Sequence, residues 1–191
     1  MVRMFGLVGL VWVLPGVALA HTGVGVGDAA SGFLHPLTGA DHILAMVAVG
    51  LWASQLGRPG LWLPICFPLL MVVGAAIGRS GVFVPGTEAM VAGSLLVLGA
   101  AVVLAWRAPV GTAAVIVGGF AMFHGYAHGM EIPMGASPAL YAAGFVVATA
   151  LLHGVGLGIG LLGRWPAGAM AVRVMGAGVA GLGGVLLFAG G

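Results

Sequence analysis

The chain has 191 residues, of which 61% are hydrophobic and only 5% carry a formal charge. So little polar surface excludes an ordinary water-soluble domain, and the mean hydropathy of +1.21 indicates a membrane protein. The net charge of +2 comes from six arginines against four acids, without any lysine. So few basic side chains do not indicate nucleic-acid binding, and we interpret the arginines as determinants of membrane topology. A single cysteine, Cys66, excludes a disulfide framework and is expected to be a buried apolar residue.

The first twenty residues have the pattern of a cleavable signal peptide. Arg3 precedes an apolar run, a Pro-Gly pair interrupts that run, and Ala18-Leu19-Ala20 places small residues at a cleavage position. We therefore expect residues 1–20 to be removed and residues 21–191 to form one transmembrane domain; an uncleaved first span is the alternative. Cleavage would make His21 the N-terminus, where its imidazole and the α-amine are candidate metal ligands, unless this end is simply disordered.

Apolar runs then divide the chain into six candidate transmembrane helices. Each run approaches the ~20 residues that an α-helix needs to cross the hydrocarbon core. Proline, glycine or arginine marks the breaks, and the period-two alternation of a membrane β-barrel is absent. The expected fold is an all-α membrane protein, in which a cleavable signal peptide precedes a six-helix transmembrane bundle. The expected spans are Gly32–Ala53, Gly60–Gly78, Thr87–Trp106, Val110–Gly129, Ala139–Leu162 and Ala169–Ala189.

The placement of charged residues predicts the orientation. A cleaved signal puts the mature N-terminus outside the inner (cytoplasmic) membrane, and six spans return the C-terminus to that side. Four arginines then lie on the cytoplasmic side and one outside, in agreement with the positive-inside rule. They are Arg58, Arg107, Arg164 and Arg173, against Arg79. The same topology puts Asp28, Glu88 and Glu131 at the outer side, where an acidic mouth would concentrate cations. For Glu88 we favour a plain surface charge at a helix start.

The fourth span carries the segment Phe123-His124-Gly-Tyr-Ala-His128-Gly-Met-Glu131. Spacings of four and seven residues put His124, His128 and Glu131 on one face of a helix. Two imidazoles and a carboxylate form a partial shell for Ni²⁺, Co²⁺ or Zn²⁺. The alternative is a pair of structural histidines that hydrogen-bond to neighbouring helices. Gly125 and Gly129 leave an adjacent stripe bare, so another helix is expected to pack closely there.

The first span carries the segment His35-Pro-Leu-Thr-Gly-Ala-Asp41-His42. His35 and His42 are expected to share a helical face, with Asp41 about 100° away. Asp41 would orient an imidazole of another span or ligate directly, whereas His35 by itself could be an interfacial residue. Pro36 is expected to start the regular helix, and the glycine after it to permit local unwinding. In the fifth span, His153 fits a pathway ligand and a structural hydrogen-bonding residue equally well.

These two segments resemble the motifs of the HupE/UreJ family of membrane proteins, His-Pro-x-x-Gly-x-Asp-His and Phe-His-Gly-x-Ala-His-Gly-x-Glu. The resemblance covers essentially the whole chain, including the signal peptide and the six-span layout. The family is associated with the uptake of nickel, sometimes cobalt, for hydrogenase or urease maturation. The resemblance implies a metal path formed by His35, Asp41, His42, His124, His128 and Glu131.

We therefore expect a permease in the lipid bilayer, without catalytic residues or a permanent cofactor, that moves Ni²⁺ or Co²⁺ inward as its substrate. The chain has no phosphate-binding Walker A motif. Coupling to membrane potential, to downstream consumption or to a separate subunit stays open, as does homo-oligomer formation. The alternatives are a metal-binding assembly factor that does not transport, a membrane haem protein, and an intramembrane metalloenzyme with Glu131 as its base.

Overall fold

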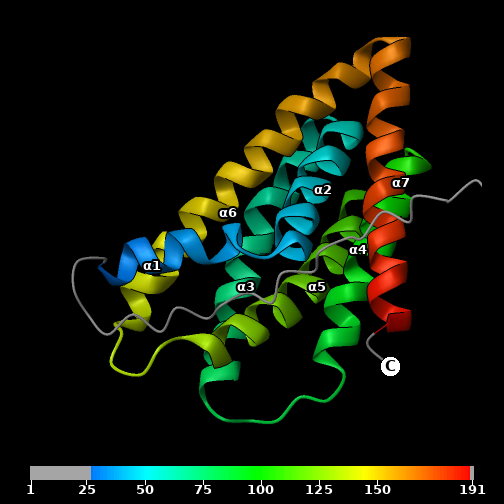
Figure 1. The fold of residues 1–191 in the computed structure, drawn as a ribbon. Helices are drawn as coiled ribbons and strands as arrows, with labels where there is room; N and C mark the ends of the chain where they lie inside the picture. The colour runs from blue at the N-terminus through cyan, green and yellow to red at the C-terminus, as the bar shows by residue number, and fades with distance from the viewer. Residues whose placement is uncertain (1–26, 190–191) are drawn as a thin grey trace, which may run out of the picture.

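The computed structural model describes residues 27–189, and within that range it contains helices and no strand. Figure 1 shows the bundle that these helices form. The expected signal peptide and His21 lie outside the described residues. The α-helices are α1 (Asp28–Leu34), α2 (Ala40–Leu56), α3 (Leu63–Arg79), α4 (Thr87–Val103), α5 (Val110–Glu131), α6 (Pro138–Gly160) and α7 (Pro166–Ala189). Three short 3₁₀ helices join them: η1 (His35–Leu37), η2 (Arg58–Trp62) and η3 (Leu161–Arg164).

Four helical segments are long and apolar enough to cross a membrane, and five are if the bent pair of α1 and α2 counts as one span. The all-α membrane architecture is therefore confirmed, whereas the count of six membrane-long helices is not. The difference lies in α4, which has 17 residues and ends at Val103 instead of Trp106. Ala105 then takes a positive φ of 45°, and the Trp106 carbonyl accepts a hydrogen bond from the Trp52 indole at 2.8 Å.

The first motif does not form one regular helix from Pro36; the helix is interrupted at Gly39, where local unwinding was expected to be permitted. A 3₁₀ turn closes between the Thr38 amide and the His35 carbonyl at 3.1 Å, and Gly39 follows in an extended conformation. The chain therefore bends by 81° before α2 begins at Ala40. A side chain at position 39 would collide with Asp41 and His42, so glycine at the bend leaves room for these two side chains.

Glycine contacts set the directions of the helices. A methyl group on Gly125 would meet the backbone at Met71, and one on Gly129 would meet the backbone at Ala75, so α3 and α5 run parallel in close contact. This confirms the bare stripe expected beside the histidines of α5. Gly50 of α2 lies against the backbone of α6 near His153, and α2 and α6 run parallel. Gly99 of α4 lies against the backbone of α7, and these two helices run antiparallel. The connections therefore alternate between the two ends of the bundle.

The outside of the bundle is apolar and much of its polar chemistry is inside. Large apolar side chains such as Leu69, Val115 and Val174 are more than 60% exposed. Three histidines, by contrast, are buried: His124, His128 and His153. A multi-pass membrane protein has this distribution, because lipid covers the apolar exterior while ionisable groups face the interior of the bundle.

Candidate metal centre

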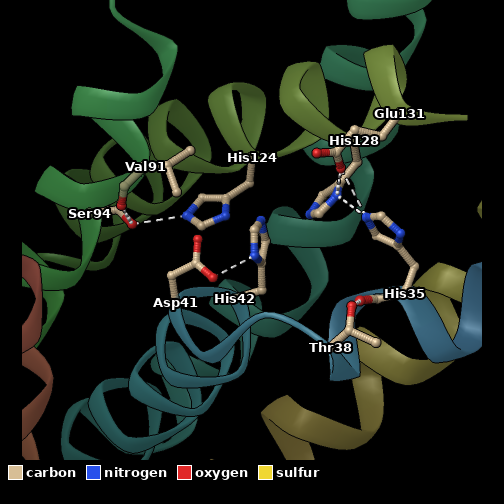
Figure 2. Close-up of polar contacts among 9 residues, drawn as sticks. All are labelled: His35, Thr38, Asp41, His42, Val91, Ser94, His124, His128 and Glu131. Atoms are coloured by element: carbon tan, nitrogen blue, oxygen red, sulfur yellow. Dashed lines mark hydrogen bonds and ion pairs between the residues drawn. The ribbon is translucent and has the colours of Figure 1, made fainter. Parts of the chain in front are cut away.

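Three groups from the two motifs meet at the surface of the bundle. His35 Nε2 lies 2.9 Å from His128 Nδ1 and 3.0 Å from an oxygen of Glu131. The same Glu131 oxygen lies 3.2 Å from His128 Nδ1 (Figure 2). We call His35, His128 and Glu131 the surface triad, because the Glu131 side chain is 56% exposed. Glu131 ends α5 and His35 begins η1, so the bend after η1 and the end of α5 bring the motifs together.

A second group lies deeper and shares His128. Ring nitrogens of His42, His124 and His128 lie within 4.8 Å of one another, and we call these residues the buried triad. The His42 ring centroid is 4.2 Å from that of His128 and 5.2 Å from that of His124. His124 is fully buried and His128 nearly so. Figure 2 shows the five histidine and carboxylate side chains of the two triads in one continuous row.

Two residues outside the triads set the proton positions on the rings. Asp41 accepts a hydrogen bond from His42 Nδ1 at 2.9 Å. Ser94 donates its hydroxyl proton to the Val91 carbonyl at 2.6 Å, so at 2.9 Å its oxygen accepts from His124 Nε2. A neutral imidazole carries one N–H and one lone pair. The lone pairs therefore lie on His42 Nε2 and His124 Nδ1.

Three other ring nitrogens of these histidines have no hydrogen-bond partner among the described residues. They are Nε2 of His42, Nδ1 of His124 and Nε2 of His128, and all three are buried. Buried polar atoms are almost always paired, so three unpaired nitrogens in one place need an explanation. A metal ion supplies one, since ligating histidines commonly bond their other nitrogen to a carboxylate or similar acceptor, as His42 does with Asp41. The residues present therefore fit a transition-metal ion.

A cavity of about 750 Å³ borders the row of ligands. Its lining includes Asp41, Glu88 and Glu131, three of the four acids in the chain. Tyr126 holds the loop on one side of it, donating to the Val82 carbonyl at 2.8 Å and accepting from the Val84 amide at 3.0 Å. A cavity lined by carboxylates attracts cations from solution.

The acids lie partly as expected. Glu88 is exposed in the first turn of α4, as expected of a surface charge at a helix start, and it also lines the cavity. Asp28 does not, and its carboxylate accepts the backbone amide of Ser137 at 2.8 Å. The place of Asp28 in an acidic mouth therefore stays a prediction.

Other expectations about the ligands need correction. His35 and His42 do not share one helical face, because the 81° bend separates them; each reaches His128 from its own element. Asp41 orients the imidazole next to it in sequence, not one from another span. The face shared by His128 and Glu131 on α5 is confirmed by their contact. His153 belongs to neither triad.

Ser94 is the residue that sequence reasoning missed. It lies in α4, within an apolar run, and it is fully buried. The sequence feature that could have indicated Ser94 is a hydroxyl group in a span that contains no acid, amide or histidine after its first turn. A small hydroxyl can bond its own helix, so its partner on α5 was not predictable from α4 alone.

Comparisons with known proteins agree with the two motifs. The family model described as HupE / UreJ protein matches residues 9–186. The chain is also 41% identical over 175 residues to Protein HupE of Rhizobium leguminosarum bv. viciae, a match that covers 91% of this chain and 92% of that protein. No solved structure matches the chain. The matched region includes every residue of the surface and buried triads.

Proposed function

Because the chain belongs to the HupE/UreJ family, we propose that it carries a divalent transition-metal ion, Ni²⁺ or Co²⁺, inward across the inner membrane. The observation that supports this most directly is the set of three buried ring nitrogens in the buried triad that have no hydrogen-bond partner within residues 27–189. They continue the surface triad through His128 and so extend the ligands from the surface into the bundle. A stable protein has no structural need for such a row of ligands, since ionisable groups inside a span are costly.

The path begins at the cavity beside Glu88 and Glu131. Carboxylates there raise the local concentration of a hydrated cation. Glu131, His35 and His128 then replace some of the water ligands, with the carboxylate offsetting part of the ion's charge. Because Glu131 is half exposed, the ion keeps other water ligands at this stage.

The buried triad would take the ion next. Three imidazoles suit nickel, cobalt, zinc and copper, and they exclude hard ions such as Mg²⁺ and Ca²⁺. Asp41 is the nearby negative charge, held on the far side of the His42 ring. An arrangement of neutral ligands with one carboxylate behind them binds more weakly than a cage of thiolates or carboxylates, and a transported ion has to be released.

The inward direction rests on the arginines and the alternation of the helices. The connections that contain Arg58, Arg107 and Arg164 lie at one end of the bundle because successive helices alternate in direction. Positive charge marks the cytoplasmic end of membrane proteins. The surface triad lies at the other end, near the connections that follow α3 and α5. The ion would therefore enter from outside.

The principal alternative is an assembly factor that binds metal without moving it. Its ligands would be the same, so only transport distinguishes the two functions. A haem protein with facing axial histidines is disfavoured by geometry. The rings of the buried triad lie 4.2–5.2 Å apart by centroid and leave no room for a porphyrin between them.

The test is uptake of radioactive nickel by cells that express the wild type, His42→Ala or His128→Ala at equal levels. We expect accumulation above empty vector for the wild type alone. His42→Ala removes one ligand of the buried triad, and His128→Ala removes a ligand from both triads. Equal accumulation by all three proteins would refute the site assignment. Nickel binding by the purified wild type, without uptake into proteoliposomes, would instead support the assembly factor.

A further inference from the structure

Another buried histidine lies in the bundle beyond both triads. His153 of α6 is 1% exposed, and the Pro64 backbone lies near its ring, but neither ring nitrogen has a hydrogen-bond partner of good geometry among the described residues. One helical turn earlier, Thr149 is fully buried and its hydroxyl is also unpartnered. Spacing of four residues puts both side chains on one face of α6. Two unsatisfied polar side chains inside an apolar span are costly, which indicates a function.

His153 lies farther than either triad from the end of the bundle that carries Glu131. On α6, Phe145 contacts the rings of His35 and His128, so it marks the level of the surface triad. His153 comes eight residues later, about 12 Å farther along the helix. On α2, His42 marks the level of the buried triad. Gly50, again eight residues later, approaches the backbone of His153.

Phe67 of α3 connects this region to the buried triad. Its ring centroid lies 5.8 Å from that of His124 and 5.2 Å from that of His153. The phenyl ring is itself fully buried. One aromatic side chain therefore contacts the deepest ligand of the buried triad and the next available imidazole along the bundle.

We propose that His153, assisted by the Thr149 hydroxyl, is a third binding position for the transported cation, reached from His124 when the Phe67 ring moves aside. This inference rests on the proposed transport function and extends it toward the opposite end of the bundle. One imidazole and one hydroxyl bind a borderline divalent ion weakly, so the ion keeps most of its remaining water ligands. Weak binding suits a position from which the ion leaves, because conduction requires release.

The experiment separates binding from movement. Purified wild type, His153→Gln and Thr149→Val are compared for Ni²⁺ affinity in detergent by calorimetry and for the initial rate of Ni²⁺ uptake into proteoliposomes. Glutamine retains a polar side chain but no imidazole, and valine retains the shape of threonine. Thr112→Val on the exposed face of α5 is the matched control.

We expect the affinity of both variants to stay within about twofold of wild type, because the two triads are intact. Uptake by His153→Gln should fall at least about tenfold, as expected when a metal ligand is lost, and Thr149→Val should show a smaller fall in the same direction. Unchanged uptake in His153→Gln, or affinity and uptake falling together, would overturn the third position. Absence of uptake by the wild type would overturn the proposed function itself, together with the inference that rests on it.

A structural role for His153 predicts a different result. If His153→Gln does not purify as a single species, Thr149→Val decides, because it conserves volume and leaves the histidine in place. Uptake by Thr149→Val equal to that of Thr112→Val would then refute the proposal. Slower uptake at unchanged affinity would support it.

Discussion

The role assigned to Ser94 can be tested by removing a single oxygen atom. In Ser94→Ala, His124 Nε2 loses the acceptor that now lies 2.9 Å away. The ring then has no hydrogen bond to the described chain, since its opposite nitrogen is already without a partner there. The imidazole of His124 can then adopt either tautomer, and its side chain can rotate over a wider range. The lone pair at Nδ1 is no longer fixed toward His42 and His128.

The size of the effect follows from the two functions of the bond. Loss of a partner to a metal-ligating histidine typically lowers metal affinity by about 10–100-fold. A buried N–H left unpaired also costs about 1–3 kcal/mol of stability in the apo protein. Stabilisation by a bound ion grows with the ratio of ion concentration to Kd, so weaker binding also reduces the stabilisation that a given nickel concentration provides. We therefore expect a lower melting temperature without metal and a smaller nickel-induced shift than in the wild type at equal nickel concentration.

Calorimetry with Ni²⁺ and thermal unfolding with and without the ion measure both quantities. Ser80→Ala is the matched control, because the Ser80 hydroxyl donates to a carbonyl three residues earlier, as that of Ser94 does, but forms no hydrogen bond with a histidine of the described residues. Nickel affinity within twofold of wild type in Ser94→Ala would refute the idea that Ser94 orients a ligand. An equal loss of affinity in Ser80→Ala would show that the effect is not specific to the site.

Three further outcomes are expected. Nickel affinity should fall on acidification, since a protonated imidazole has no lone pair to donate; titrations at several pH values check this, and pH-independent affinity would exclude histidine ligation. Gly129→Ala should lower stability by about 1–3 kcal/mol, because its methyl group meets the Ala75 backbone, whereas Gly119→Ala, with open space around it, should not; thermal melts compare the two. Tyr126→Phe should raise hydrogen exchange at the Val84 amide, whose bond to the Tyr126 hydroxyl is lost.

The sequence predicted best what depends on local pattern. Apolar runs between proline, glycine and arginine located α5, α6 and α7 to within a few residues, because a membrane helix must satisfy its own backbone hydrogen bonds. The four-residue spacing of His124 and His128, and the bare stripe beside them, also followed from helix geometry alone. These residues therefore appeared correctly as neighbours on one face.

What depended on contacts between distant segments was not predictable. The bend at Gly39 places His35 and His42 on different elements, and spacing along the sequence cannot reveal the angle between them. The sequence indicated that Asp41 would orient an imidazole of another span or ligate directly, and the structure pairs it with the adjacent histidine. Ser94 acts on α5 from α4, so only the packing of those two helices shows its role.

His128 is the one ligand that the two triads hold in common. Its Nδ1 faces Glu131 and His35, and its Nε2, on the buried side, has no partner in the part of the chain that the structure describes. A neutral imidazole has a single lone pair for its two nitrogens. When that lone pair is on Nδ1, the proton occupies Nε2, and the buried triad is left with two lone pairs for a metal ion. When the lone pair is on Nε2, the surface triad loses one of its metal ligands instead. The two triads are therefore alternatives, and a chain with neutral His128 has a complete set of donors for one ion at a time.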